Sequence, residues 1–211
     1  MFKSFNQKHK VILLRSSWKR GLRQFVRQAV LVLLDSTVRK KHMAFKLGAD
    51  ALRELPSLTD GSILTHGTKW DAFPQRLQKQ IMQLDETVEW GDLSWFDKGW
   101  RLCVGEIEGR VVCIGWMRNA ENSQDFFIKL PDKTELLWHL IVIPEFRGQR
   151  LHQRFWLMLM HDRAKDGVES FFTNCRDYNL PSFYNIQKLG FKLIGHRIDN
   201  KLTGKSRWTP I

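Results

Sequence analysis

The chain has 211 residues, of which 43% are hydrophobic and 27% charged, as is usual for a globular protein. Its longest wholly apolar run, Ala29–Leu34, is far shorter than the ~20 residues that a membrane-spanning helix needs, and no signal-peptide core precedes it. Three cysteines without a CxxC spacing indicate reduced, buried thiols in a cytoplasmic protein, and no metal ligand set is predicted.

The net charge of +12 is concentrated near the start of the chain. The first 46 residues hold twelve Lys or Arg and a single acid, Asp35, whereas the 22 bases and 21 acids of residues 47–211 nearly cancel. Such an uneven distribution is typical of an interaction segment.

Within this basic segment, apolar residues recur at steps of three and four and predict one face of a helix: Trp18, Leu22, Phe25, Ala29, Val32 and Leu33. This face could pack on the protein's own core or on a second subunit in a homodimer. It could also contact a membrane surface through residues 15–46. Nucleic acid is a weaker interpretation because no recognised motif accompanies the charge.

We expect the helical pattern to continue to about Leu55 and to end at Pro56. The polar stretch SLTDG that follows is a plausible boundary. The sequence therefore predicts a basic helical extension, residues 1–58, and a second domain, residues 59–211.

The second domain alternates between strand and helix patterns in chain order. The predicted elements are a strand at SILTH, a helix over 73–84, a tryptophan-rich loop WGDLSWFDKGW that could line a pocket, a hairpin over 100–117, a long loop around a short FFIKL strand, a strand over 135–143, a helix over 151–164, a strand over 170–174, a helix over 181–189 and a strand over 191–198. This order predicts a mixed α/β sheet.

Two local details can be predicted as well. In the hairpin, Glu108-Gly109 forms a two-residue turn, and the resulting register places Cys103 opposite Ile114, away from Cys113. In the last helix, Asn179 is a plausible N-cap and Gly190 a plausible C-cap.

The stretch IVIPEFRGQRLHQRF, residues 141–155, leads from an apolar strand through a turn into a helix. A helix N-terminus presents unpaired backbone N–H groups and the positive end of the helix dipole. This arrangement is an anion-binding site.

Three segments together resemble the GNAT superfamily of acyl-CoA-dependent N-acyltransferases over roughly residues 60–200. They are the hairpin RLCVGEIEGRVVCIGWM, the turn LIVIPEFRGQRLHQRF and the closing stretch NLPSFYNIQKLGF. The resemblance implies an α/β (α+β) fold with a mixed, mostly antiparallel twisted sheet flanked by helices. It also implies acetyl-CoA as the cofactor.

By the same resemblance, the turn would hold the pyrophosphate of coenzyme A, and the residues that would bind the cofactor are Ile141, Val142, Arg147, Gly148, Gln149, Arg150, Leu151, His152, Asn179 and Ser182. Arg150 and His152 replace two glycines of the family motif. Their side chains could point to solvent while the backbone alone binds, they could contact the phosphates, or cofactor binding could be lost.

The resemblance also implies how acyl transfer would proceed. The backbone N–H of about Leu140 would polarise the thioester carbonyl. The amine needs a base, for which Glu135 and His139 are candidates, although strict strand alternation aims both away from the site unless a bulge reverses it. Glu106 and His66 are further candidates, and Trp138 could stack on the substrate.

The closing motif lacks a tyrosine that is common in the GNAT superfamily. Many GNAT members carry a tyrosine that protonates the departing thiolate, four residues before the Gly-Phe pair, and Ile186 stands at that position. Tyr184 lies about 200° around a helix from it and is not a substitute. The form present here is similar to branches that often lack the tyrosine.

The sequence therefore favours a cytoplasmic N-acetyltransferase that acts on a small-molecule primary amine and that could be peripheral at the inner membrane face. The basic extension resembles acetyltransferases of surface-polysaccharide assembly, which suggests an amino-sugar nucleotide. Two alternatives are a protein N-terminal or lysine acetyltransferase and a non-catalytic GNAT-fold binding module at a membrane surface.

Overall fold

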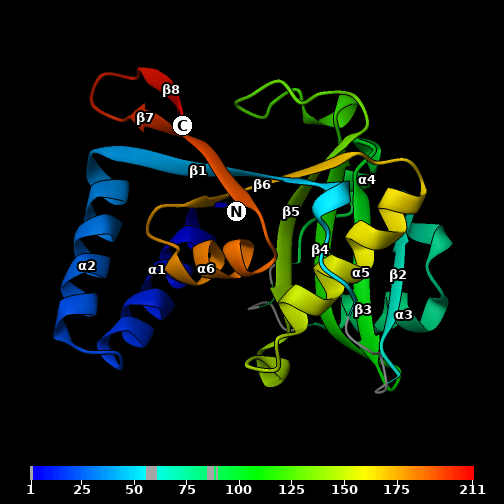
Figure 1. The fold of residues 1–211 in the computed structure, drawn as a ribbon. Coiled ribbons are helices and arrows are strands. Elements are labelled where there is room, and N and C mark those ends of the chain that lie inside the picture. The colour runs from blue at the N-terminus through cyan, green and yellow to red at the C-terminus, as the bar shows by residue number, and fades with distance from the viewer. Residues whose placement is uncertain (1, 56–60, 85–87, 89) are drawn as a thin grey trace. The chain divides into compact units, whose positions relative to one another are not determined.

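The computed structural model describes residues 2–55, 61–84, 88 and 90–211, and it separates into two compact units (Figure 1). Unit 1 comprises residues 1–45, 174–184 and 193–211, and unit 2 comprises residues 46–173 and 185–192. This division differs from the predicted boundary near residue 58, because unit 1 joins the N-terminal segment to parts of the chain's C-terminal third. The predicted break at Pro56 and most of the boundary stretch after it lie outside the described residues.

The helices and strands follow one another in chain order. They are α1 (Phe2–Trp18), α2 (Leu22–Thr37), β1 (Arg39–Gly48), β2 (Ile63–Gly67), α3 (Gln75–Met82), α4 (Ser94–Asp97), β3 (Arg101–Ile107), β4 (Arg110–Asn119), β5 (Thr134–Val142), α5 (Leu151–Lys165), β6 (Ser170–Arg176), α6 (Leu180–Lys188), β7 (Lys192–Asn200) and β8 (Ser206–Pro210). Short 3-10 turns lie at Ala49–Ala51, Trp70–Ala72, Glu121–Ser123 and Pro144–Phe146.

The strands are ordered β2-β3-β4-β5-β6-β1-β7-β8 in the sheet. The pairs β2–β3, β3–β4, β4–β5 and β7–β8 are antiparallel, and β5–β6 is parallel. The sheet is therefore mixed and mostly antiparallel, as predicted. Strand β8 was not predicted from the sequence.

The N-terminal segment differs from its prediction in two ways. The predicted helical face from Trp18 to Leu33 is interrupted, because Trp18 ends α1 and Gly21, at φ 110°, precedes α2. The predicted helix to about Leu55 is wrong, because residues 39–48 form β1. There Phe45 and Leu47 are buried while Lys46 is exposed, so strand alternation overrides the helix propensity of the intervening residues.

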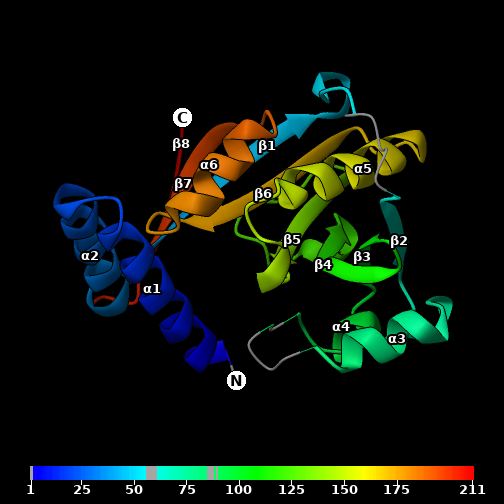
Figure 2. The same cartoon turned by 90° about the horizontal axis from the view of Figure 1, so that it is seen from below.

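Unit 2 is built in three layers, with α5 on one face of the sheet and α3 and α4 on the other (Figure 2). The core between the sheet and α5 is centred on Val112, Cys113, Leu151 and Phe155. The opposite core is larger and aromatic and consists of Phe73, Leu77, Ile81, Trp95, Trp100, Leu102, Val104, Val111, Ile114 and Trp116.

The β3–β4 hairpin has the predicted turn but a shifted register. Glu108 and Gly109 both have positive φ, 50° and 75°, as a type I′ turn requires. A bulge next to Gly105 shifts the register, so Cys103 pairs with Gly115 rather than with Ile114. All three cysteines are buried and free.

The long connection between β4 and β5 contains no strand at FFIKL within the described residues. Phe126 and Leu130 are nevertheless buried, and Asp125 pairs with the buried Arg118 at 2.6 Å. The apolar residues of this stretch therefore anchor a loop. Among the described helices, none is long and apolar enough to span a bilayer.

Candidate active site

Strand β5 is irregular where the resemblance places the reacting groups. Ile141 pairs with Ile114 and Trp138 pairs with Trp116, so three steps along β5 match two steps along β4. The extra residue is accommodated by a bulge in which His139 adopts the left-handed conformation, at φ 59°. The printed sequence gives no sign of this bulge.

The bulge breaks the alternation of side chains along β5. The His139 ring lies 5.8 Å from the Trp95 ring of α4, and Trp138 packs against the same aromatic core. Both side chains therefore face α4, whereas Leu140 packs against the α5 core. Strict alternation predicts that His139 points to the face opposite Trp138. The bulge turns the His139 side chain to the same face as Trp138.

The parallel pairing of β5 with β6 covers Thr134 to Leu136, whose register partners are Ser170 to Phe172. Beyond it, within the described residues, the Thr173 hydroxyl donates to the Leu137 carbonyl at 3.1 Å. The bulged half of β5 lies past the end of this pairing. A strand that separates from its neighbour leaves backbone groups available for a ligand.

The other candidates for the base, Glu135, Glu106 and His66, are paired with charged side chains. Arg163 of α5 donates to both Glu135 oxygens, at 3.0 and 3.2 Å, so Glu135 faces α5 in a buried bidentate pair. Glu106 is fully buried and pairs with Arg76.

His66 is similarly occupied. Its Nε2 lies 2.6 Å from an Asp162 carboxylate oxygen, and its Nδ1 lies 3.1 Å from the Arg101 guanidinium. These contacts favour structural roles for His66 and for the two glutamates. His139 is thus the titratable candidate that the bulge turns toward the α4 face.

The loop after β5 shows why the family motif uses glycine. Gly148 has φ 86° and Arg150 has φ 59°, so both occupy the left-handed region at the start of α5. Arg150 occupies a position where a side chain is conformationally unfavourable. The Arg147 side chain donates to the Val142 carbonyl at 3.1 Å and fastens the loop to the end of β5.

The same loop exposes consecutive backbone donors. Within the described residues, the N–H groups of residues 148–152 have no backbone acceptor, whereas those of Gln153 and Arg154 bond to the Arg150 carbonyl. Five successive N–H groups at the positive end of a 15-residue helix form a backbone nest, an arrangement that favours anions. Arg147 and Arg150 add exposed positive charge.

His152 contributes no charge to this nest. Its Nδ1 is buried without a hydrogen-bond partner among the described residues, and its ring lies edge-on to Trp156, 6.4 Å between centroids. Burial lowers the pKa of His152 to about 4, so the imidazole is neutral near pH 7. Of the two residues that replace glycines, Arg150 is therefore the one that offers a cation.

The closing motif is a capped helix. The Ser182 N–H donates to the Asn179 side-chain oxygen at 3.3 Å, which confirms the predicted N-cap, and Gly190 has φ 98° as a C-cap glycine does. Asn179 and Ser182 belong to unit 1, and the loop after β5 belongs to unit 2. Ile186 is buried and Tyr184 is half exposed.

The tryptophans of the tryptophan-rich loop, Trp90, Trp95 and Trp100, belong to the aromatic core, whereas most of the other residues of the loop are exposed. Trp116 stacks on Trp90, is approached edge-on by Trp95 and donates its indole N–H to the Trp90 carbonyl at 2.6 Å. A Cβ at Gly91 would meet the Trp116 indole nitrogen at 2.4 Å, so only glycine fits there.

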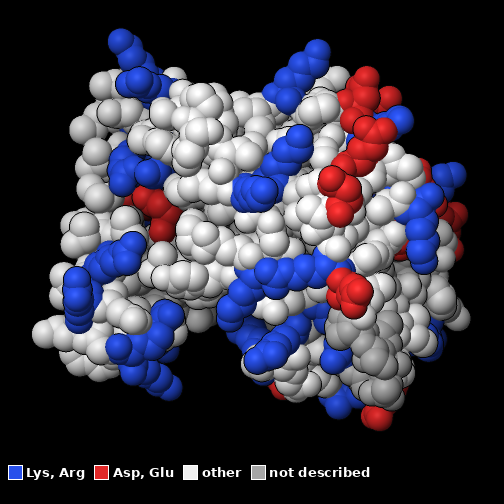
Figure 3. Space-filling model, viewed as in Figure 1, with Lys and Arg blue, Asp and Glu red and all other residues white. Residues whose placement is uncertain are grey.

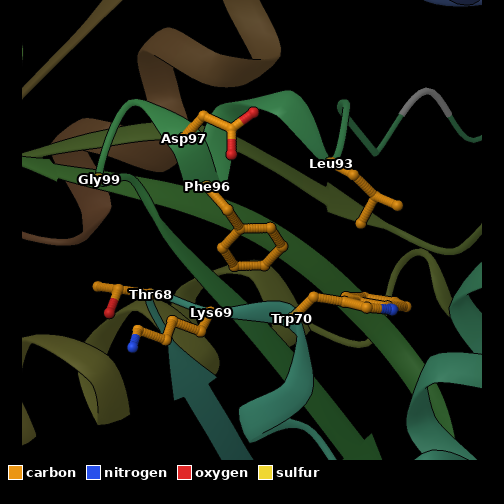
Figure 4. Close-up of a pocket in the computed structure, with 7 residues that line it drawn as sticks. All are labelled: Thr68, Lys69, Trp70, Leu93, Phe96, Asp97 and Gly99. Carbon is orange, nitrogen blue, oxygen red and sulfur yellow. The ribbon is translucent and has the colours of Figure 1, made fainter.

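At the outer edge of this cluster lies an open pocket of about 610 Å³ (Figure 4). It is lined by Thr68, Lys69, Trp70, Leu93, Phe96, Asp97 and Gly99. Phe96 reaches from α4 toward the Trp70 ring, 6.2 Å away. Its neighbour Trp95 contacts the His139 ring, so α4 connects the pocket to the bulge.

The mixed sheet with its flanking helices matches the fold of GNAT acetyltransferases. The sequence itself matches no family model and no curated protein. Among solved structures, similar folds include a GNAT-family acetyltransferase from Colwellia psychrerythraea, with 15% identity, a TM-score of 0.53 and coverage of 83% of this chain and 60% of that one.

A second similar structure is a tandem GNAT protein of the clavulanic acid biosynthesis pathway, with 13% identity, a TM-score of 0.52 and coverage of 85% and 56%. A third, from Drosophila, has 12% identity, a TM-score of 0.51 and coverage of 82% and 56%. This chain thus spans less than two thirds of each of these structures. At such identities the likeness defines the fold alone.

Proposed function

We propose that the protein is an acyl-CoA-dependent N-acyltransferase that moves an acetyl group to a primary amine. The observation that carries the proposal is the row of five N–H groups, residues 148–152, which have no backbone acceptor in the described part of the chain and follow a bulged strand. A pyrophosphate needs several convergent donors and no nearby buried carboxylate. The nest provides the donors, and Arg147 and Arg150 flank it with positive charge.

When bound, coenzyme A would supply the activated acyl thioester. The loop N–H groups would hold its pyrophosphate, and Ile141 and Val142 at the end of β5 would also contact the cofactor. The Leu140 N–H, in the bulge, is our candidate donor to the carbonyl oxygen on which negative charge develops. His139 is our candidate base, because its ring is turned to the face on which α4 and the pocket lie. We propose that one ring nitrogen of His139 takes the amine proton.

For the acceptor we propose an amino sugar carrying an anionic group, such as an amino-sugar nucleotide. The pocket at α4 supports this choice. Trp70 and Phe96 offer aromatic faces on which a sugar ring can stack, Lys69 can pair with a phosphate and Asp97 can accept hydrogen bonds from hydroxyl or amino groups. A cytoplasmic location fits both this chemistry and the three free, buried thiols.

Cofactor binding is tested first, without any acceptor. A ligand present at 100 times its dissociation constant raises the free energy of unfolding by ~2.7 kcal/mol, which for a chain of this size raises Tm by several degrees. Acetyl-CoA and coenzyme A should both raise Tm, and pantetheine, which lacks the pyrophosphate, should raise it much less. Absence of a shift at saturating acetyl-CoA would overturn the proposal.

Turnover is tested next by release of the free thiol with a panel of amines. We expect amino-sugar nucleotides to react faster than simple diamines or peptides with free N-termini. Trp70→Ala should raise KM for the amino sugar while leaving the Kd for coenzyme A unchanged. Acetyl-CoA binding without turnover of any amine would favour the non-catalytic module instead.

A further inference from the structure

Helix α2 presents its apolar residues to solvent. Leu22, Val26, Val30 and Leu33 are 50–68% exposed and follow one another at steps of four, four and three, so they form a continuous stripe on one side of the helix. We call these four residues the α2 stripe. A helix packed on its own core normally shows the opposite pattern, with the apolar side inward.

The two buried residues of α2 are polar. Gln28 and Asp35, which lie two turns apart and opposite the α2 stripe, are the buried residues of the helix. The Gln28 side chain donates to the Tyr178 carbonyl, and Asp35 pairs with Lys10 and Arg176, each at 2.8 Å. Rotating α2 to bury the stripe would leave Asp35 without its two cations, so these contacts keep the stripe facing outward.

Exposed basic residues accompany the α2 stripe on the α1–α2 hairpin. Arg15, Lys19, Arg20, Arg23 and Arg27 are all exposed, and Figure 3 shows Lys and Arg gathered over the α1–α2 hairpin with uncharged surface between them. The single acid of the first 46 residues, Asp35, is buried and paired. Trp18, at the end of α1, is 61% exposed beside this basic rim.

We propose that the α1–α2 hairpin docks on an anionic lipid bilayer, with the α2 stripe and Trp18 entering the interface and the basic rim contacting the headgroups. A bilayer surface satisfies the two properties together, since it offers an apolar interior beneath negative charge. A second copy of the chain would place two basic rims against each other. A nucleic acid would neutralise the rim but leave the α2 stripe in water.

The test is co-sedimentation of the full chain with vesicles. We expect binding to vesicles of 70% phosphatidylcholine and 30% phosphatidylglycerol, weaker binding in 0.5 M salt and little binding to phosphatidylcholine alone. Each base near an anionic surface contributes a factor of about five to partitioning at low salt. Arg23→Gln with Arg27→Gln should therefore lower the partition coefficient about 25-fold.

Removing the stripe tests the apolar half of the proposal. Leu22→Gln, Val26→Gln and Leu33→Gln together should lower partitioning more than about tenfold, because glutamine keeps the helix propensity but not the apolar surface. Leu202→Gln is the matched control: Leu202 is also in unit 1 and 76% exposed, but lies in the β7–β8 turn, so this variant should bind as the wild type does. Circular dichroism checks that each variant is folded.

The depth to which Trp18 enters the bilayer is measured with brominated lipids. Their quenching of tryptophan fluorescence should fall when Trp18 is replaced by phenylalanine. Three results would overturn the proposal: no binding to anionic vesicles, equal binding by the wild type and the folded stripe variant, or a dimer in solution that the stripe variant converts to a monomer while vesicle binding persists. The proposal is independent of catalysis, because acetyl-CoA binding in solution should be the same in all of these variants.

Discussion

Arg150 occupies a backbone conformation that favours glycine, and replacing it with glycine should stabilise the protein. Its φ of 59° and ψ of 17° lie in the left-handed region, where a Cβ crowds the following carbonyl oxygen. The side chain is exposed, and among the described residues its guanidinium makes no hydrogen bond or ion pair. The Arg150 carbonyl accepts from Gln153 and Arg154, and glycine would keep both bonds.

The expected size follows from two opposing effects. Relief of the left-handed conformation contributes about 1–2 kcal/mol. The greater freedom of glycine in the unfolded chain removes about 0.5–1 kcal/mol of that gain. Arg150→Gly should therefore raise the free energy of unfolding by about 0.5–1 kcal/mol, or Tm by about 1–4 °C for a chain of this length.

Arg150→Ala is the matched control because it removes the guanidinium but keeps the Cβ. Urea unfolding should show a gain for Arg150→Gly and none for Arg150→Ala. An equal gain in both variants would refute the conformational explanation and assign the effect to charge.

Isothermal titration with coenzyme A answers a second question with the same pair of variants. If the backbone nest alone holds the pyrophosphate, Arg150→Gly keeps or improves the affinity. If the guanidinium contacts the phosphates, both variants lose affinity.

Three further predictions concern the bulge, the buried ion pair and pH. Gly115→Ala should destabilise the protein by about 1–3 kcal/mol, since its Cβ would lie 2.7 Å from a Leu140 methyl carbon and 3.1 Å from the Leu140 Cα; wild-type urea stability would contradict this. Glu135→Gln should lower the free energy of unfolding by about 2 kcal/mol, because it weakens the pair with Arg163, and kcat should be retained. A folded variant without measurable kcat would instead identify Glu135 as the base. Burial lowers the pKa of His152 from its ordinary value of 6.5 to about 4. The neutral imidazole therefore contributes fully to stability above pH 6.5. This contribution is lost as pH falls from 6.5 toward 4, which lowers the free energy of unfolding by up to about 3 kcal/mol. His152→Leu should flatten this part of the stability–pH curve, and parallel curves for the two proteins would exclude His152 as the cause.

Several parts of the fold could be predicted because their signals are local. The turn at Glu108-Gly109 needs two residues with positive φ, and the sequence supplies an acid followed by glycine. The helix after Asn179 has its cap and its terminating glycine within a dozen residues. The strand, turn and helix of residues 141–155 are present as predicted, and anion binding at this turn stays a prediction.

The candidate base could not be oriented from the sequence. Alternation along β5 predicts that His139 faces away from Trp138, and the bulge places the two side chains on the same face. A bulge depends on the length and pairing of the neighbouring strand, here β4 with its Gly115 against Leu140. The same kind of non-local register shift invalidated the predicted Cys103–Ile114 pairing.

The sequence by itself determined the alternation of strands and helices, the basic N-terminal charge and the turn between β5 and α5, because each is encoded in residues near one another in the chain. The tertiary structure decided what distant segments determine together. Residues 39–48 became strand β1 because sheet pairing outweighs their helix propensity. Helix α2 turned its polar residues inward because Asp35 meets Arg176, a residue 141 positions away, and this contact leaves the apolar stripe facing water.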